Sequence, residues 1–520
     1  MNGTWTLTKL VLRRERLIVP LWVLLLVALA AGQLQRYAAG IGDIGAFARE
    51  MAANQALSAF AGEVPAPTLA GMAVWKNGDA IYTILALIMI LTVVRHTRGE
   101  EESGRAELVG AGVIGRFAPL TAALAVACGS SVLAGLSVAV AMIGAGAAAA
   151  GSVAFGAAVA AVGVVFAGLG AVAAQLTQTA RIAVGVAGLG LGVSYALRFA
   201  ADGSGVAALK WLSPQGWSHL VRPYGDDNVV VLLLSLGCAG AAIAVAYLLL
   251  ARRDLGHGLI PERPGPAGST GLRSPLRLAW RLHKGLLTGW IVGYAVAGLV
   301  FGALAASIGE VSRQGEAVAE FFRRYTASPE ASMSDAYLWL IALSLGYVAA
   351  LYPLLALLRL RAEEQSGRAE LLLAHPVGRL RWAAGHLVLA LTGSAAILAV
   401  AGLTMGLAIG DPLGVLGGTL VQVPAVWVLA GVGVAAFGLL PKAAAAISWG
   451  AYLFVNLFGE VLGPILGIDY WIAKFLVPFP NLPMVLSGED FTVTPVLIMI
   501  GLTAALVAVG LTGLRRRPII

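Results

Sequence analysis

The sequence predicts an all-α polytopic membrane protein, with twelve transmembrane helices in two parallel six-helix repeats and both termini in the cytoplasm. Composition, charge distribution and an internal repeat support this prediction. Of the 520 residues, 59% are hydrophobic and only 12% are charged, whereas about 25% are charged in a typical soluble domain. So few charges cannot cover a water-exposed surface, which excludes a soluble enzyme, a disulfide-rich secreted scaffold and a disordered chain.

Twelve apolar segments are long enough for helices that cross a bilayer, which requires about 20 residues. In the first half of the chain the predicted spans are 17–36, 79–95, 118–143, 152–176, 182–198 and 229–251. In the second half they are 286–306, 336–358, 383–409, 413–440, 443–458 and 493–514.

The charges are distributed unequally between the segments that connect these spans. If the N-terminus is cytoplasmic, the inner segments hold 25 of the 35 Lys and Arg residues and 10 of the 27 Asp and Glu residues. This is the positive-inside pattern, so the positive net charge follows membrane topology and predicts no nucleic-acid partner. The 29 Arg residues against 6 Lys residues are typical of a GC-rich bacterial genome, which predicts location in a bacterial plasma membrane.

One segment occurs twice, at a spacing of 263 residues. Residues 98–116 read RGEEESGRAELVGAGVIGR, and residues 361–379 read RAEEQSGRAELLLAHPVGR. Each half therefore has six spans, and an even number returns the chain to its starting side, which predicts parallel repeats. The predicted domains are a first half at 1–251, a charged, proline-rich cytoplasmic linker at 252–274 and a second half at 275–520.

Both copies of this segment follow the second span of their half, on the predicted inner side. Glu101 and Arg105, like Glu364 and Arg368, are four residues apart, a spacing that favours a short surface helix. A preceding glycine allows the chain to bend there. A solvated charged loop is the common alternative, but the same residue order at two matched positions favours a pair of docking helices for a symmetric cytoplasmic partner.

With these two segments and Trp211-Leu-Ser-Pro-Gln-Gly-Trp217, the chain resembles the permease subunits of ABC-2 type (type V) exporters. More narrowly, it resembles actinobacterial polyketide-antibiotic and multidrug exporter permeases. The resemblance implies export of hydrophobic or amphipathic compounds, driven by two copies of a separate cytoplasmic ABC ATPase that binds ATP and Mg²⁺. It also implies coupling-helix residues that contact this partner: Glu101, Glu102, Gly104, Arg105, Glu107, Glu364, Gly367, Arg368 and Glu370.

Missing motifs narrow the mechanism further. No G-x-x-x-x-G-K-[ST] motif occurs, so we expect a transport subunit that binds no nucleotide or metal cofactor itself. An ion-coupled twelve-helix carrier is the main alternative, but it usually needs ionisable residues at membrane depth, and the middles of the predicted spans hold none. A membrane-embedded enzyme is a weaker alternative, because the six His residues show no metal-ligand spacing.

The resemblance also implies a substrate pathway, because spans two and five of each half line the central cavity in ABC-2 permeases. Aromatic and Met side chains suit hydrophobic ligands of variable shape, although ordinary helix packing or lipid contact explains them equally well. The candidate pathway residues are Tyr82, Met89, Tyr195, Tyr347, Tyr352, Trp449, Tyr452, Phe454 and Phe458.

Overall fold

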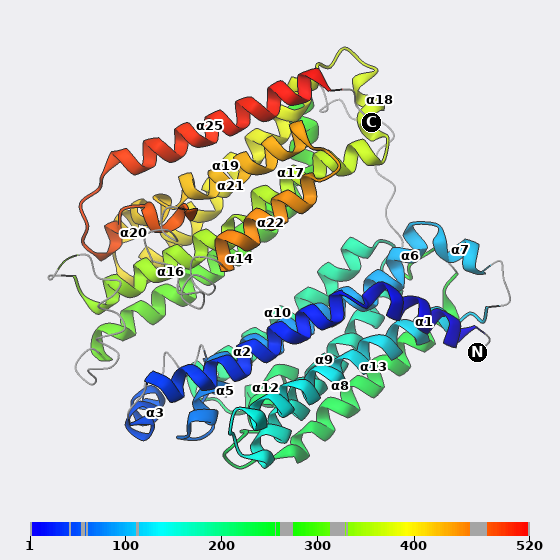
Figure 1. Cartoon of the computed structure of the whole chain (residues 1–520), viewed down its shortest axis with the longest axis vertical. Coiled ribbons are helices and arrows are strands. Elements are labelled where there is room, and N and C mark those ends of the chain that lie inside the picture. Colours follow the sequence, from blue (N-terminus) through cyan, green and yellow to red (C-terminus); the bar gives the residue numbers. More distant parts are fainter. Residues whose placement is uncertain are drawn as a thin grey trace. The chain divides into compact units, whose positions relative to one another are not determined.

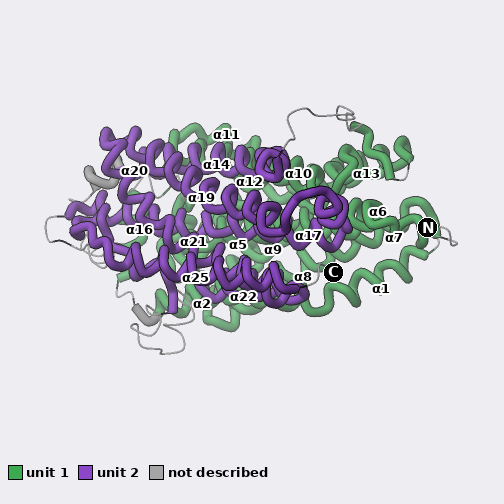
Figure 2. The backbone as a smooth tube through the Cα atoms, turned by 90° about the horizontal axis from the view of Figure 1, so that it is seen from above, with its two compact units in different colours: residues 1–265 green, residues 266–520 purple. Residues whose placement is uncertain are grey.

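The computed structural model consists of α-helices, short 3₁₀ turns and loops, with no strand in the part of the chain that it describes (Figure 1). The described residues are 3–40, 43–53, 58, 61–110, 114–254, 256–260, 274–311, 328, 331–457 and 476–517. They form two compact units, residues 1–265 and 266–520 (Figure 2). The boundary between the units falls within the predicted linker.

Unit 1 has six long helices, and shorter helices at their ends. The long helices are α2 (Ile18–Gly40), α5 (Leu69–His96), α8 (Ala118–Gly144), α9 (Ala149–Leu176), α10 (Ala180–Ser204) and α13 (Leu232–Arg252). The shorter ones are α1 (Thr4–Glu15), α3 (Ile44–Ala53), α6 (Arg98–Glu102), α7 (Arg105–Gly110), α11 (Ala208–Trp211), α12 (Pro214–Leu220) and the 3₁₀ turn η1 (Val229–Val231).

The described residues of unit 2 form helices that are more often interrupted. Its helices are α14 (Pro275–Val311), α16 (Met333–Ala349), α17 (Leu351–Gln365), α18 (Arg368–Leu373), α19 (Arg379–Ile409), α20 (Pro412–Leu420), α21 (Val423–Leu439), α22 (Ala444–Leu457) and α25 (Val493–Arg516). Two 3₁₀ turns, η3 (Phe479–Asn481) and η4 (Val485–Ser487), precede α25.

Two of the interruptions in unit 2 coincide with proline residues. Pro353 and Pro424 lie in the first turns of α17 and α21. Because proline has no backbone N–H, neither can donate to the carbonyl four residues earlier, and the helix breaks just before it. In the first half, Ile90 and Ala161 occupy the positions 263 residues earlier, and α5 and α9 run without a break.

Eleven helical segments in the described residues are long and apolar enough to cross a membrane. They coincide with eleven of the twelve predicted spans, which confirms a polytopic helical membrane protein. The segment predicted at 443–458 corresponds to a shorter apolar helix, Ala444–Asn456. The second predicted span begins too late: α5 starts at Leu69 rather than at residue 79.

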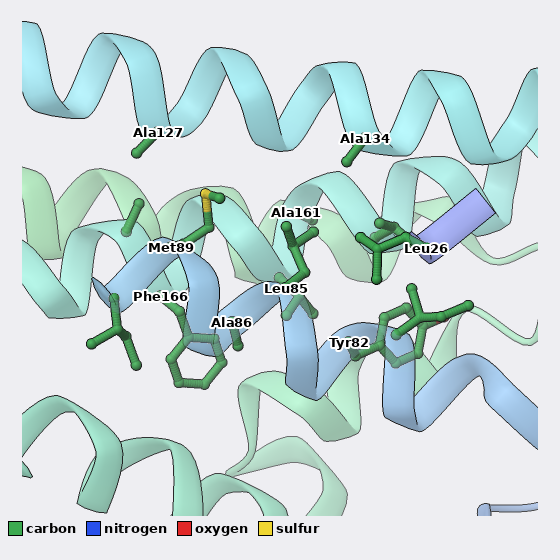
Figure 3. Packing of buried hydrophobic residues seen from close by; sticks show 14 of the residues in the cluster. Leu26, Tyr82, Leu85, Ala86, Met89, Ala127, Ala134, Ala161 and Phe166 are labelled. Atoms are coloured by element: carbon green, nitrogen blue, oxygen red, sulfur yellow. The ribbon is translucent and has the colours of Figure 1, made fainter. Parts of the chain in front are cut away.

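The core of unit 1 lies where α5 and α9 pack against α2 and α8. Figure 3 shows Leu85, Ala86 and Met89 of α5 pointing among the neighbouring helices. Small residues allow close approach: a Cβ atom added to Gly135 of α8 would lie 2.2 Å from the carbonyl oxygen of Gly156 in α9. Such small-residue contacts permit helix association in lipid, where the hydrophobic effect supplies no driving force between helices.

Gly135→Ala is therefore expected to lower the free energy of unfolding by about 1–3 kcal/mol, because α8 and α9 must move apart. Gly129→Ala on the same helix is the control, since no other atom lies within 4 Å of its Cβ position. Thermal unfolding of the purified protein in detergent measures both. Equal melting temperatures for the two variants would contradict the close contact.

Candidate functional site

The two repeated segments have the same backbone path. After α5 and α6 in unit 1, and after α17 in unit 2, the chain turns at a glycine and begins a short helix, α7 or α18. Gly104 and Gly367 both have φ near +71°, a left-handed conformation that is strained for residues with a Cβ atom. The predicted bend at these glycines is confirmed.

The predicted pairing of Glu with Arg four residues later is wrong in both copies. Arg105 Nε lies 3.2 Å from Glu100 Oε2, while Glu101 and Glu364 pair with arginines far along the chain. The physical reason is the glycine turn. Because it ends one helix and starts another, the two residues do not lie on one continuous helical face.

Instead, each segment is tied to the end of the last helix of its own unit. Glu101 pairs with Arg253, whose Nη1 lies 2.8 Å from Glu101 Oε2, directly after α13. Glu364 pairs with Arg517, whose Nη2 lies 2.8 Å from Glu364 Oε1, directly after α25. Arg253 and Arg517 are 264 residues apart, so the two ion pairs are repeat equivalents. We did not predict these ion pairs from the sequence, although the spacing of the two arginines is close to the 263-residue spacing of the repeated segment.

The remaining coupling candidates divide into anchored and exposed side chains. Glu102 accepts a hydrogen bond from the backbone N–H of Ala180 at 3.0 Å, at the start of α10. The side chains of Arg105, Glu107, Arg368 and Glu370 are exposed. The leucine that follows each Glu is also exposed, with 80% of Leu108 and 72% of Leu371 accessible. The structure thus leaves an Arg-x-Glu-Leu face open on both α7 and α18.

The candidate pathway residues occupy different environments. Tyr82, Met89, Tyr347 and Tyr352 are buried within their units, and Tyr195 is half-buried with the Arg198 guanidinium 4.7 Å from its ring centre. Tyr452 is half-buried, and Trp449 and Phe454 are exposed. Phe458 lies outside the described residues. A role in substrate binding stays a prediction for all nine.

The middles of the predicted spans hold no ionisable residue, but two predicted spans of unit 1 have charged residues at or just beyond their ends. Asp79 lies three turns into α5, and Arg198 and Asp202 lie on α10, all three buried. Arg198 Nη2 is 3.1 Å from Asp79 Oδ2, and its Nη1 is 3.4 Å from Asp202 Oδ2. Both helices extend past the predicted ends, since α5 begins at Leu69 and α10 continues to Ser204, so these charged residues lie within the helices.

Side chains from the following loops complete this network. His219 Nε2 lies 3.0 Å from Asp79 Oδ1, and the ammonium group of Lys210 contacts Asp202. Lys210 Nζ is also 2.9 Å from Glu63 Oε1. Burial raises the pKa of Glu63, but the hydrogen bond and charge of Lys210 outweigh it, so the net pKa is lowered. These interactions join α5, α10, α11 and α12. In the second half of the sequence, the positions that correspond to Asp79 and Arg198 in the repeat hold apolar residues.

Comparison with known proteins identifies the family. The family profile described as the C-terminal domain of the multidrug efflux system permease Rv1217c matches residues 272–515. The multidrug efflux system permease protein Rv1217c of Mycobacterium tuberculosis is 42% identical over 533 aligned positions, which cover 100% of this chain and 95% of that protein. The chain belongs to the multidrug efflux permease family. This permease is thus a multi-pass transport protein rather than an enzyme, which confirms the resemblance to multidrug exporter permeases.

Proposed function

We propose that this permease is the membrane subunit of an ATP-binding cassette exporter in the bacterial plasma membrane. Two copies of a cytoplasmic ABC ATPase dock on α7 and α18, bind ATP with Mg²⁺ and supply the energy. The permease moves hydrophobic or amphipathic compounds, such as antibiotics and drugs, out of the cell. The proposal includes twelve spans in two parallel repeats, with both termini in the cytoplasm.

The observation that carries this proposal is the duplicated segment. Each copy presents an exposed Arg-x-Glu-Leu face, and each is joined by a buried Glu–Arg ion pair to the last long helix of its unit. A partner that pushes on the exposed face therefore moves a transmembrane helix as well. Two equivalent faces fit two copies of one partner, and the absence of a P-loop motif from the sequence requires the nucleotide site to be on that partner.

Reversing the exposed charges tests the docking step. Arg105→Glu combined with Arg368→Glu is expected to abolish co-purification of a co-expressed ABC ATPase and to lower drug efflux at least tenfold. Two like-charge contacts replace two favourable ones at the interface. Arg13→Glu is the matched control, because Arg13 is exposed on α1 and outside both segments. Unchanged assembly and efflux in the double variant would refute docking at these helices.

An ion-coupled carrier is the second candidate, and the buried Asp79–Arg198–Asp202 network favours it, because ionisable residues inside spans often bind coupling ions. The energy source separates the two functions. In inverted membrane vesicles, export that continues with ATP after a protonophore collapses the proton gradient supports the ATPase. Export that stops under these conditions supports the carrier.

A further inference from the structure

Unit 1 contains a cavity beside the α6–α7 segment, and the proposed transport cycle assigns no ligand to it. Its volume is about 520 Å³, and its walls come from α1, the α6–α7 segment, the start of α8 and the end of α13. Pockets for small organic ligands measure about 300–1,000 Å³. The cavity is therefore large enough for part of an amphipathic molecule.

One side of the cavity is apolar. Leu7, Leu10 and Val11 of α1 face it together with Leu108 of α7 and Leu120 of α8. Val11 and Leu120 are buried, whereas Leu10 is 40% and Leu108 is 80% exposed. The apolar wall therefore continues from the interior to the surface, and hydrocarbon would cover side chains that otherwise contact water.

The polar side of the cavity carries an arginine without a carboxylate partner. Arg116 Nη2 donates to the carbonyl oxygen of Leu250 at 2.8 Å and to that of Arg253. Among the described residues no Asp or Glu forms an ion pair with Arg116, whereas Glu100 and Glu101, which also line the cavity, are each paired with arginines. Arg116 is thus the cation available to an anionic ligand.

A buried histidine atom on the cavity wall also lacks a partner. His96 Nε2 lies 2.6 Å from Glu15 Oε1, but no hydrogen-bond partner for Nδ1 exists in the described structure. Burial raises the pKa of Glu15, but the His96 hydrogen bond and the charge of Arg95 outweigh it, so the net pKa is lowered. An ionised Glu15 accepts a hydrogen bond from His96 Nε2–H, which leaves Nδ1 to form a hydrogen bond with a ligand hydroxyl.

The helix that forms the apolar wall has the properties of an interfacial helix. On α1, Trp5 and Leu12 are exposed together with the basic residues Lys9, Arg13 and Arg14, and the first long apolar helix follows at Ile18. Basic amphipathic helices of this kind lie at the level of lipid headgroups and favour anionic lipids.

From these features we infer that the cavity binds one anionic phospholipid whose headgroup carries hydroxyl groups, as in phosphatidylglycerol. An acyl chain lies against Leu7, Leu10 and Leu120, the phosphate binds Arg116, and a headgroup hydroxyl donates to His96 Nδ1. The inference uses the proposed cytoplasmic position of the N-terminus only to place this lipid in the cytoplasmic leaflet of the membrane. It does not require the ATPase or transport.

Native mass spectrometry of the purified full-length permease in dodecyl maltoside tests this inference. Dioleoylphosphatidylglycerol is expected to bind at concentrations about tenfold lower than dioleoylphosphatidylcholine, which has the same acyl chains but no net charge and no headgroup hydroxyl. Arg116→Gln is expected to weaken phosphatidylglycerol binding about tenfold, because it removes a charge-assisted hydrogen bond. Arg181→Gln, the same change on an exposed arginine outside the cavity and outside α1, is expected to leave binding unchanged.

A second variant tests the cavity independently of Arg116, which also binds backbone carbonyls of the fold. Leu7→Trp fills the apolar side and is expected to remove the bound lipid without changing the charge. Equal losses in Arg116→Gln and Arg181→Gln, equal binding of the two lipids, or full binding in Leu7→Trp would overturn the inference. Competition by glycerol 1-phosphate at equal concentration would also overturn it, because the site would then recognise only a free phosphate. None of these results depends on ATP-driven export.

Discussion

Arg198→Met is expected to lower the free energy of unfolding of the permease by about 3–5 kcal/mol, because it removes the buried cation that lies between Asp79 and Asp202. Arg198 is fully buried and contacts both Asp79 and Asp202. Removing one member of a buried ion pair destabilises far more than replacing the whole pair with apolar groups. Unfolding by sodium dodecyl sulfate in mixed micelles, followed by tryptophan fluorescence, measures the loss.

Arg222→Met provides the control for this experiment. Arg222 also pairs with an Asp, but in that pair the side chains of Arg222 and Asp226 are 45% and 66% exposed. Solvent screens such a pair, so its loss changes stability by less than about 1 kcal/mol. Asp79→Asn combined with Arg198→Met should recover part of the stability lost in Arg198→Met alone. A single variant no less stable than Arg222→Met would contradict the buried network.

Glu364→Arg is expected to lower export at least tenfold, since it places two cations side by side where the end of α17, just before α18, is joined to the end of α25. Arg517 is almost fully buried, its guanidinium lies 4.8 Å from the centre of the Phe437 ring, and Glu364 is its carboxylate partner. A buried charge without its partner destabilises by several kcal/mol, which is enough to move α18 away from its anchor. Efflux of a fluorescent drug from cells expressing the permease with the proposed ATPase measures the effect.

Exchanging the two charges distinguishes the loss of this ion pair from a general destabilisation of the fold. Glu364→Arg combined with Arg517→Glu restores opposite charges at the same two positions and is expected to recover much of the export. Asp490→Arg is the matched control, because Asp490 is an exposed acidic residue of unit 2 that lies outside both repeated segments. If the exchange recovers nothing although the protein is expressed at the wild-type level, the ion pair does not couple α18 to α25.

The sequence predicted the membrane class and most of the helices, because lipid imposes strong compositional rules. Long apolar segments identified eleven helices that the structure contains, and the repeated segment pointed to the two matching glycine turns at Gly104 and Gly367. These features depend on local properties: the length of an apolar run, and a glycine where φ must be positive.

Tertiary structure decided the features that depend on partners distant in sequence. Sequence spacing paired Glu101 with Arg105 and Glu364 with Arg368, yet the folded chain pairs the two glutamates with Arg253 and Arg517. Hydropathy placed Asp79 and Arg198 at the very ends of their predicted spans, yet both lie within longer helices and are buried. A charged side chain lowers hydropathy wherever it occurs, but whether it can be buried depends on the opposite charge that the fold brings beside it. The apolar runs alone therefore determined that this chain crosses a membrane many times, and only the folded helices decided which charges pair inside it.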